Sequence, residues 1–400
     1  SFLLHQRRMR GTATKMAQTG DGNLNIQEGV FTTCEPDDNF WTVHGDSIEL
    51  RPIEGYGVAR NVTIKVKNLP IAYFPYFRFP IDDSRQSGFL VPTLGQDSDG
   101  GVDIGLSYYF NLAPEYDATY TPRSIWKRGL LHEGEFRYLT PKTSNIIAGT
   151  FLAEDDEYDD RLVIDASRPD DVDRQNRWLT YVKHRGRSGR WASSINYTSV
   201  SDIDYLHDLG ALTGLESGIG QTRGSGNSAA LARTGSVTYT GIGWQSRLEM
   251  LSFQQLSQTQ PEQYQTLPRL TISRNQKLGG FSVVGLIQAS EFDKDSERNT
   301  SQPIVGSRIA TDVDIKYPLR NSWGFLTPAL RIVHRNYHLD DASTISRNSA
   351  SITTTSASLD AGVVFERQTQ ISSRHLLQTL EPRIFYLHTA DKFQDDLPLF

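Results

Sequence analysis

Residues 69–139 decide the fold class of this chain: LPIAYFPYFRFPIDDSRQSGFLVPTLGQDSDGGVDIGLSYYFNLAPEYDATYTPRSIWKRGLLHEGEFRYL. The stretch is rich in aromatic residues, glycine and proline, and it divides into short segments in which apolar and polar residues alternate. Alternation with a period of two puts apolar side chains on one face of a β-strand and polar side chains on the other. The stretch therefore predicts antiparallel sheets with one apolar face and one polar face.

The same alternation continues to the end of the chain. It is clearest over residues 102–110, 242–250, 309–317 and 359–366. Segments of about ten residues have the length of strands that cross a bilayer at a tilt. Tight turns alternate with long polar connections at residues 154–174, 199–233, 291–307 and 336–356. This asymmetry is typical of outer-membrane barrels. A soluble sandwich or propeller also has alternating strands, but the lack of a fixed repeat period disfavours a propeller.

The composition excludes two other classes of protein. No stretch of the 400 residues approaches the roughly 18 consecutive apolar residues of a membrane helix, which excludes a helical membrane protein. A hydrophobic fraction of 37% and a mean hydropathy of -0.46 remain compatible with a barrel, because only every second strand residue faces lipid. A net charge of -6 without a basic stripe argues against binding to nucleic acid.

The first part of the chain predicts a separate β domain. In a strand over residues 57–67, one face is expected to carry Val58, Val62, Ile64 and Val66. This apolar face is either the core of an ordinary sandwich or a trough for acyl chains. Three prolines, at residues 70, 75 and 80, then predict a stiff connector, because dense prolines disfavour a central strand.

Two blocks of the sequence resemble a known family. PYFRFPIDDSRQSGFLVP (residues 75–92) and YYFNLAPEYDATYTPR (residues 108–123) are similar to the LptD family of outer-membrane lipopolysaccharide assembly proteins, and the similarity extends to residues 378–383. The resemblance implies an all-β fragment. Residues 1–75 would be the C-terminal part of a periplasmic β-jelly-roll with the start of a linker, and residues 76–400 the first half of a large antiparallel transmembrane β-barrel.

The resemblance also implies a function and partners. The chain would belong to an outer-membrane translocon that moves lipopolysaccharide from the periplasm to the outer leaflet, through an apolar jelly-roll trough and a lateral barrel gate. This is transport rather than enzymatic activity, and it needs no cofactor. The implied partners are lipopolysaccharide itself, the plug lipoprotein LptE and the periplasmic bridge protein LptA, and the N-terminal part would lie in the periplasm.

The resemblance assigns roles to individual residues. Its trough consists of Val58, Val62, Ile64 and Val66. Pro92 matches the first of two family prolines, which lie in the first two barrel strands and loosen the junction between the first and last strands, the lateral gate, since proline cannot donate a ladder hydrogen bond. The second family proline falls at Ser107, which keeps its N–H. Cys34, the only cysteine, matches a family cysteine whose disulfide partner lies near the far C-terminus, so we expect that partner outside this chain.

The sequence contains no recognisable catalytic motif and no metal-ligand pattern. The acidic run Glu154–Glu157 is interpreted as a solvated loop, with cation bridging to lipopolysaccharide as the alternative. A general porin or ligand-uptake barrel is the main alternative function, but it gives no reason for an amphipathic periplasmic domain. A lipid A hydrolase would need a nucleophile–histidine pair, which no motif indicates.

Overall fold

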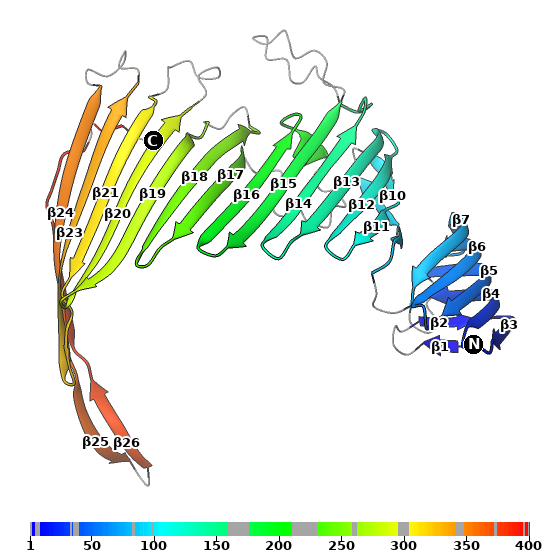
Figure 1. Ribbon diagram of the computed structural model, residues 1–400, viewed down its shortest axis with the longest axis horizontal. Helices are drawn as coiled ribbons and strands as arrows, with labels where there is room; N and C mark the ends of the chain where they lie inside the picture. Colours follow the sequence, from blue (N-terminus) through cyan, green and yellow to red (C-terminus); the bar gives the residue numbers. More distant parts are fainter. Residues whose placement is uncertain are drawn as a thin grey trace. The chain divides into compact units, whose positions relative to one another are not determined.

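The computed structural model describes most of the chain. The described residues are 2–4, 9–32, 34, 40–81, 85–90, 92–97, 100–158, 176–209, 230–257, 262–294, 304–340, 348–371, 374–394, 397–398 and 400. They form two compact units, residues 1–137 and residues 138–400. Both units are built almost entirely from antiparallel strands, which confirms the predicted all-β class (Figure 1).

The first unit begins with a seven-stranded sheet, called here the first sheet. Its strands are β1 (Phe2–Leu4), β2 (Met9–Thr12), β3 (Lys15–Gln18), β4 (Leu24–Thr32), β5 (Trp41–Arg51), β6 (Tyr56–Val66) and β7 (Leu69–Pro80). They pair in the order β1-β2-β4-β5-β6-β7, with β3 on β4. Alternating apolar residues on β4 to β7 form its core, which consists of Ile26, Val43, Ile48, Ala59, Val62 and Phe74.

Strand β7 corrects the prediction of a proline-rich connector. Its 12 residues pair along β6, and it stands at the end of the sheet order. Proline is tolerated in such an edge strand because one side of the strand has no neighbour to receive an N–H. Phe74 pairs with Val62 on one side of Pro75, and Tyr76 pairs with Arg60 on the other. The first sheet therefore runs to Pro80, past the domain boundary predicted at residue 75.

Six further strands follow in the first unit, the last of which runs two residues past its end at residue 137. These are β8 (Gly88–Phe89), β9 (Thr93–Asp97), β10 (Gly101–Gly105), β11 (Tyr108–Ala113), β12 (Tyr116–Ile125) and β13 (Gly129–Leu139). β9 pairs with β10, β8 with β11, and both β10 and β11 with β12. The segment predicted as one strand over residues 102–110 is thus divided between β10 and β11.

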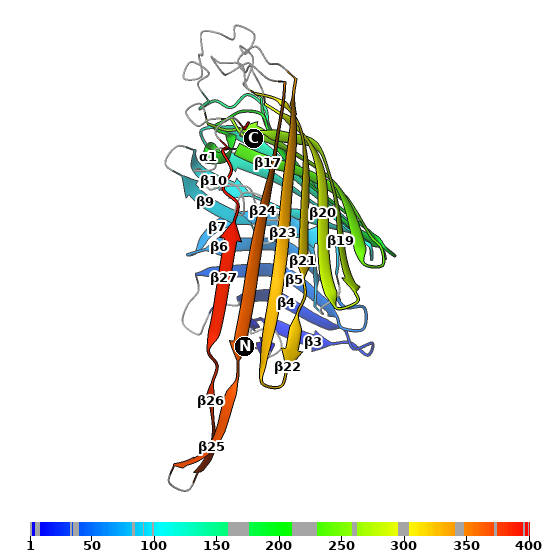
Figure 2. The same ribbon diagram turned by 90° about the vertical axis from the view of Figure 1, so that its left-hand side faces the viewer.

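The second unit is one large antiparallel sheet with a hairpin beyond it. Its strands are β14 (Thr143–Leu152), β15 (Arg177–Ser188), β16 (Trp191–Val200), β17 (Ala230–Thr240), β18 (Trp244–Gln255), β19 (Gln265–Leu278), β20 (Phe281–Asp293), β21 (Gly306–Lys316), β22 (Leu319–Asn321), β23 (Gly324–Leu339), β24 (Ser349–Val363) and β27 (Arg383–Thr389). Strands β25 (Phe365–Ile371) and β26 (Arg374–Leu380) pair only with each other and extend past β24 and β27 (Figure 2).

The two faces of this large sheet differ in chemistry. Residues that pair directly on antiparallel strands lie on the same face, so the register assigns each side chain to a face. One face exposes the apolar residues Leu248, Leu270, Ile272, Ile287, Ile309, Leu330 and Leu359. The other face carries ion pairs, such as Arg331 with Asp312 at 3.4 Å and Arg383 with Asp360 at 2.7 Å. Strands of 10 to 16 residues with this pattern match barrel strands that face lipid outside and water inside.

Helix is almost absent from the described residues. The single α-helix, α1 (Tyr205–Asp208), has four residues. Within the described ranges, no helix is long and apolar enough to cross a membrane.

Candidate functional site

An apolar cavity of about 330 Å³ lies in the first unit. Its lining from the first sheet consists of Phe31, Phe40, Trp41, Val43, Val62, Ile64, Val66, Phe74 and Phe77. Its lining from the following segment consists of Phe89, Leu90, Pro92 and Leu94. Three of the four predicted trough residues and the predicted gate proline therefore line one cavity. Such a partly open, almost wholly apolar space suits acyl chains, because it offers their methylene groups contacts without polar groups to desolvate.

The fourth predicted trough residue, Val58, lies on the opposite face of β6. The alternation changes phase at Asn61, whose backbone has a positive φ of 51°. After Asn61 the core-facing residues include Val62, and before it they include Ala59. Val58 pairs instead with Glu49 and Arg78. The prediction that all four residues share one face is wrong at Val58, because strict alternation does not allow for this irregularity.

Hydrogen bonds hold the irregularity at Asn61 in place. Its side-chain amide donates a hydrogen bond to Asp46 Oδ2 at 3.0 Å, and its side-chain oxygen accepts a hydrogen bond from the Tyr73 hydroxyl at 2.9 Å. Asparagine tolerates the left-handed region better than most residues. One strand therefore contributes Ala59 to the core at one end and Ile64 and Val66 to the cavity at the other.

The segments that carry Pro92 and Ser107 form an interrupted hairpin. Phe89 pairs with Tyr108 on one side of the interruption, and Thr93 pairs with Gly105 on the other. The register shifts by one residue between these two pairs, as it does at a β-bulge. Across the bulge, the Leu90 N–H donates to the Ser107 carbonyl at 2.9 Å. Pro92 lies where the ladder is already broken, as expected of a strand proline.

A second proline, Pro122, lies at the same level on the next strand. Leu106 N–H donates to the Pro122 carbonyl at 3.2 Å, and Ser107 accepts a hydrogen bond from the Thr121 hydroxyl at 2.8 Å. The two residues of such an antiparallel pair normally exchange two hydrogen bonds, but Pro122 has no N–H to return. The ladders on both sides of Leu106 and Ser107 are therefore weakened at one level, although Ser107 itself is not proline. The sequence analysis did not single out Pro122, because its importance depends on which residue it pairs with.

The polar face of these strands holds buried ion pairs. Arg123 Nε donates to Asp103 Oδ1 at 2.6 Å, and Glu133 lies 3.8 Å from the same guanidinium. All three residues are at least nine-tenths buried. Arg137 Nε donates to Asp117 Oδ1 at 2.6 Å, and Arg85 also binds Asp117. These pairs link β12 to β10, to β13 and to the segment before β8, on the polar face beside the weakened ladder.

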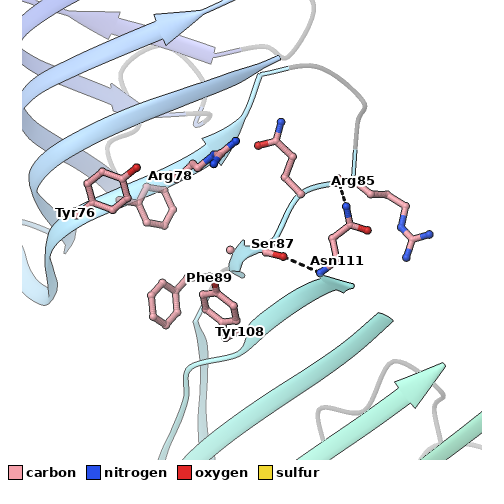
Figure 3. Close-up of a pocket in the computed structure, with 10 residues that line it drawn as sticks. Tyr76, Arg78, Arg85, Ser87, Phe89, Tyr108 and Asn111 are labelled. Atoms are coloured by element: carbon pink, nitrogen blue, oxygen red, sulfur yellow. Dashed lines mark hydrogen bonds between the residues drawn. The ribbon is translucent and has the colours of Figure 1, made fainter. Parts of the chain in front are cut away.

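A second cavity, of about 530 Å³, adjoins the apolar one (Figure 3). Phe77 and Phe89 line both cavities. The other residues that line the second cavity are Tyr76, Arg78, Arg85, Gln86, Ser87, Gly88, Tyr108 and Asn111. The Asn111 N–H donates to Ser87 Oγ at 2.8 Å, and the Asn111 side-chain amide donates to the Arg85 carbonyl at 2.6 Å. An apolar cavity and a cavity with a mixed polar and apolar lining thus share a wall of aromatic rings.

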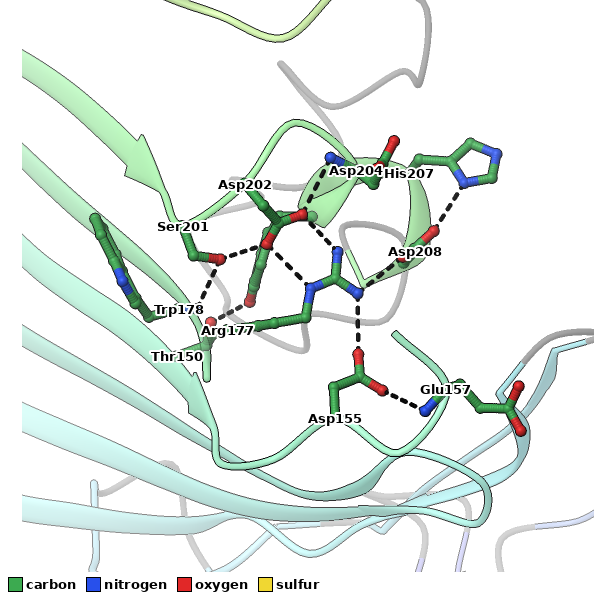
Figure 4. A network of polar contacts seen from close by, with 11 residues as sticks. Thr150, Asp155, Glu157, Arg177, Trp178, Ser201, Asp202, Asp204, His207 and Asp208 are labelled. Carbon is green, nitrogen blue, oxygen red and sulfur yellow. Dashed lines mark hydrogen bonds and ion pairs between the residues drawn. The ribbon is translucent and has the colours of Figure 1, made fainter. Parts of the chain in front are cut away.

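The second unit contains a buried charged cluster around Arg177 (Figure 4). Its fully buried guanidinium binds Asp155 at 2.9 Å, and Asp202 and Asp208 at 2.8 Å. The guanidinium also lies 4.2 Å from the centroid of the Tyr158 ring. These contacts join the segment after β14 to the segment that contains α1. Asp155, one of the acidic residues interpreted as a solvated loop, is instead buried in this ion pair.

Cys34 follows β4 and is partly buried. Its N–H donates to Thr32 Oγ1 at 3.1 Å. Its predicted disulfide needs a cysteine outside this chain, so that pairing stays a prediction.

Comparison with known proteins identifies the family. The family model described as LptD, LPS transport system D, matches residues 175–400. The chain belongs to the LptD family. It is 36% identical over 411 residues to the LPS-assembly protein LptD of Hahella chejuensis, a match that covers all of this chain and 49% of that relative. It is 33% identical to LptD of Pseudomonas putida and 32% identical to LptD of Pseudomonas aeruginosa, again along its whole length. The chain spans about half the length of these curated LptD relatives.

Proposed function

We propose that this chain is part of an outer-membrane translocon that moves lipopolysaccharide from the periplasm to the outer leaflet. The observation that carries the proposal is the apolar cavity formed by Val62, Ile64 and Val66 beside the bulge at Pro92. Membership of the LptD family, whose matched relatives are named LPS-assembly proteins, supports lipopolysaccharide as the molecule that uses this cavity.

The two-faced sheet of the second unit supports the membrane setting. Its exposed apolar face suits lipid, and its charged face suits the sugars of a polar cargo passing through a barrel lumen. A general porin would need the same two faces, but it would have no use for an aromatic-lined cavity on a separate sheet. We therefore favour transport of an amphiphile over passage of small solutes.

Exit to the membrane would use a lateral gate at the junction between the first and last barrel strands, which the interrupted hairpin beside it would loosen. Opening a sheet sideways requires ladder hydrogen bonds to break, and a ladder that lacks bonds at one level opens at lower cost. Pro92 and Pro122 both lack a donor at this level, and the bulge opposite Ser107 removes further pairing. A barrel of this size also needs its lumen filled, so we propose the lipoprotein LptE as a plug and LptA as the periplasmic donor.

Cys34 would tie the periplasmic domain to the barrel. A disulfide to a cysteine near the C-terminus of the full-length protein would close a very long loop and restrict the unfolded chain. Non-reducing electrophoresis of the full-length parent tests this: Cys34→Ser should abolish the mobility difference between oxidised and reduced protein. The same mobility difference in that variant would rule out the bridge.

The transport proposal is tested by photo-crosslinking in living cells that express the full-length parent. A photoreactive residue at Ile64 or Val66 should yield adducts with lipopolysaccharide that disappear when upstream transport is de-energised. Val58 is a matched control, since it lies on the same strand but on the other face. Adducts absent from both cavity positions, or equally strong at Val58, would refute the proposal.

A further inference from the structure

Arg78 is positioned differently from Arg85, the other arginine that lines the second cavity. It lies on β7 and lines the second cavity, and its guanidinium carbon is 3.8 Å from the centroid of the Tyr56 ring. Within the described parts of the chain, no carboxylate forms an ion pair with Arg78. Glu54, whose charge interacts with that of Arg78, is held by Arg51 at 3.4 Å.

The Arg85 guanidinium, in contrast to that of Arg78, is held by several groups of the protein. It is bound by Asp117, by the Tyr109 hydroxyl and, at 3.2 Å, by the Pro114 carbonyl. Its donors are therefore engaged within the protein, and the Arg85 carbonyl accepts the Asn111 side-chain amide in the cavity wall. Of the two arginines that line the second cavity, Arg78 is the one with its donors available to a ligand.

A guanidinium stacked on an aromatic ring has its plane fixed, and its fork of N–H groups matches the oxygens of a phosphate. Because the stack already restricts the side chain, less conformational freedom is lost when an anion binds. Hydroxyl groups on Tyr76 and Ser87 line the same cavity and can add hydrogen bonds.

We propose that Arg78 binds the phosphate group of an amphiphile whose acyl chains occupy the adjacent apolar cavity. The shared wall of Phe77 and Phe89 places the apolar and polar parts of one ligand side by side. Phe89 itself contacts Phe74, with ring centroids 5.1 Å apart, and Tyr108, with ring centroids 4.9 Å apart. This inference rests on the proposed transport function and assigns a headgroup subsite to it.

The test uses the full-length parent in complex with its partners, with a photoreactive residue at Ile64. The probes are phosphorylated lipid A and the same lipid after removal of its phosphates. The unaltered protein should crosslink the phosphorylated lipid at least about tenfold more strongly, the change expected from one charge-assisted hydrogen bond. Arg78→Gln should lose this preference without changing the yield with dephosphorylated lipid, and Arg78→Lys should keep part of it.

Arg60 provides the matched control. It is exposed, it pairs with Tyr76 on the neighbouring strand, and it is not among the lining residues. Arg60→Gln should therefore keep the preference for phosphate. An unchanged preference in Arg78→Gln, or equal crosslinking of both lipids by the unaltered protein, overturns the phosphate subsite alone. No crosslinking of either lipid overturns the transport proposal as well.

A competition experiment separates a headgroup from a free anion. Inorganic phosphate at millimolar concentration should leave crosslinking of the phosphorylated lipid unchanged, because it gains nothing from the apolar cavity. Loss of crosslinking under these conditions would show that Arg78 binds free phosphate, and the amphiphile subsite would be wrong.

Discussion

Replacing Pro122 with threonine should strengthen the ladder at the proposed gate. The new N–H faces the Leu106 carbonyl, which completes a pair that now has only the Leu106-to-Pro122 hydrogen bond at 3.2 Å. A backbone hydrogen bond contributes about 1 kcal/mol net, and the better strand propensity of threonine adds up to about 1 kcal/mol. Together these lower the population of an opened gate by a factor of about 5 to 30.

The assay measures how fast newly made lipopolysaccharide reaches the cell surface in cells expressing Pro122→Thr in the full-length parent. Hydrogen exchange at Leu106 and Ser107 reports the ladder directly and should slow in the variant. Pro328 is a matched control, because it also accepts an N–H, from Tyr317 at 3.0 Å, in the middle of a strand of the second unit. Slower exchange with unchanged transport would refute the gate, and so would equal transport defects in Pro122→Thr and Pro328→Thr.

Three further predictions follow from the described contacts. Pro92→Ala should slow lipopolysaccharide export by restoring a donor beside the bulge, and normal outer-membrane barrier function in that variant would count against the gate. Arg177→Met should destabilise the second unit by about 3–5 kcal/mol, because it leaves buried carboxylates without their cation; this is measured as a lower denaturation temperature of the full-length protein. Burial lowers the pKa of His44 below its usual 6.5, and the charge of Lys65 lowers it further. The contribution of His44 to the stability of the first sheet should therefore be full above pH 6.5 and decrease as the pH drops from there toward the lowered pKa. His44→Gln should flatten that dependence in thermal denaturation curves.

Alternation in the sequence predicted the all-β class and individual strands such as those over residues 57–67 and 309–317, because a strand with one buried or lipid-facing face must repeat every two residues. It failed where the backbone departs from regular geometry. At Asn61 the positive φ shifts the alternation of buried and exposed residues along β6, so the prediction assigned Val58 to the wrong face. Asparagine at that position was the available signal, but many asparagines occupy turns or ordinary strands without this effect.

Besides backbone irregularities, the sequence analysis could not predict which residues pair across neighbouring strands. The bulge opposite Ser107 exists only because the pairs Phe89–Tyr108 and Thr93–Gly105 differ by one residue in register. Register depends on two segments at once, so a proline such as Pro122 could be seen but not placed opposite Leu106. The strand character of β7 was missed for a similar reason, since prolines are tolerated once a strand is known to be at an edge.

The bulge divides the hairpin into segments of unequal length, two paired residues between β8 and β11 and five between β9 and β10. When the sheet is pulled apart, the pairing between β8 and β11 should break first, because it has fewer hydrogen-bonded residues. Separation that starts at β8 should then stop at the interruption, because the pairs of β9 and β10 are not continuous with it and need a larger force to break. The proposed gate would then open in two stages, first at the two pairs of β8 and β11 and then at the five pairs of β9 and β10.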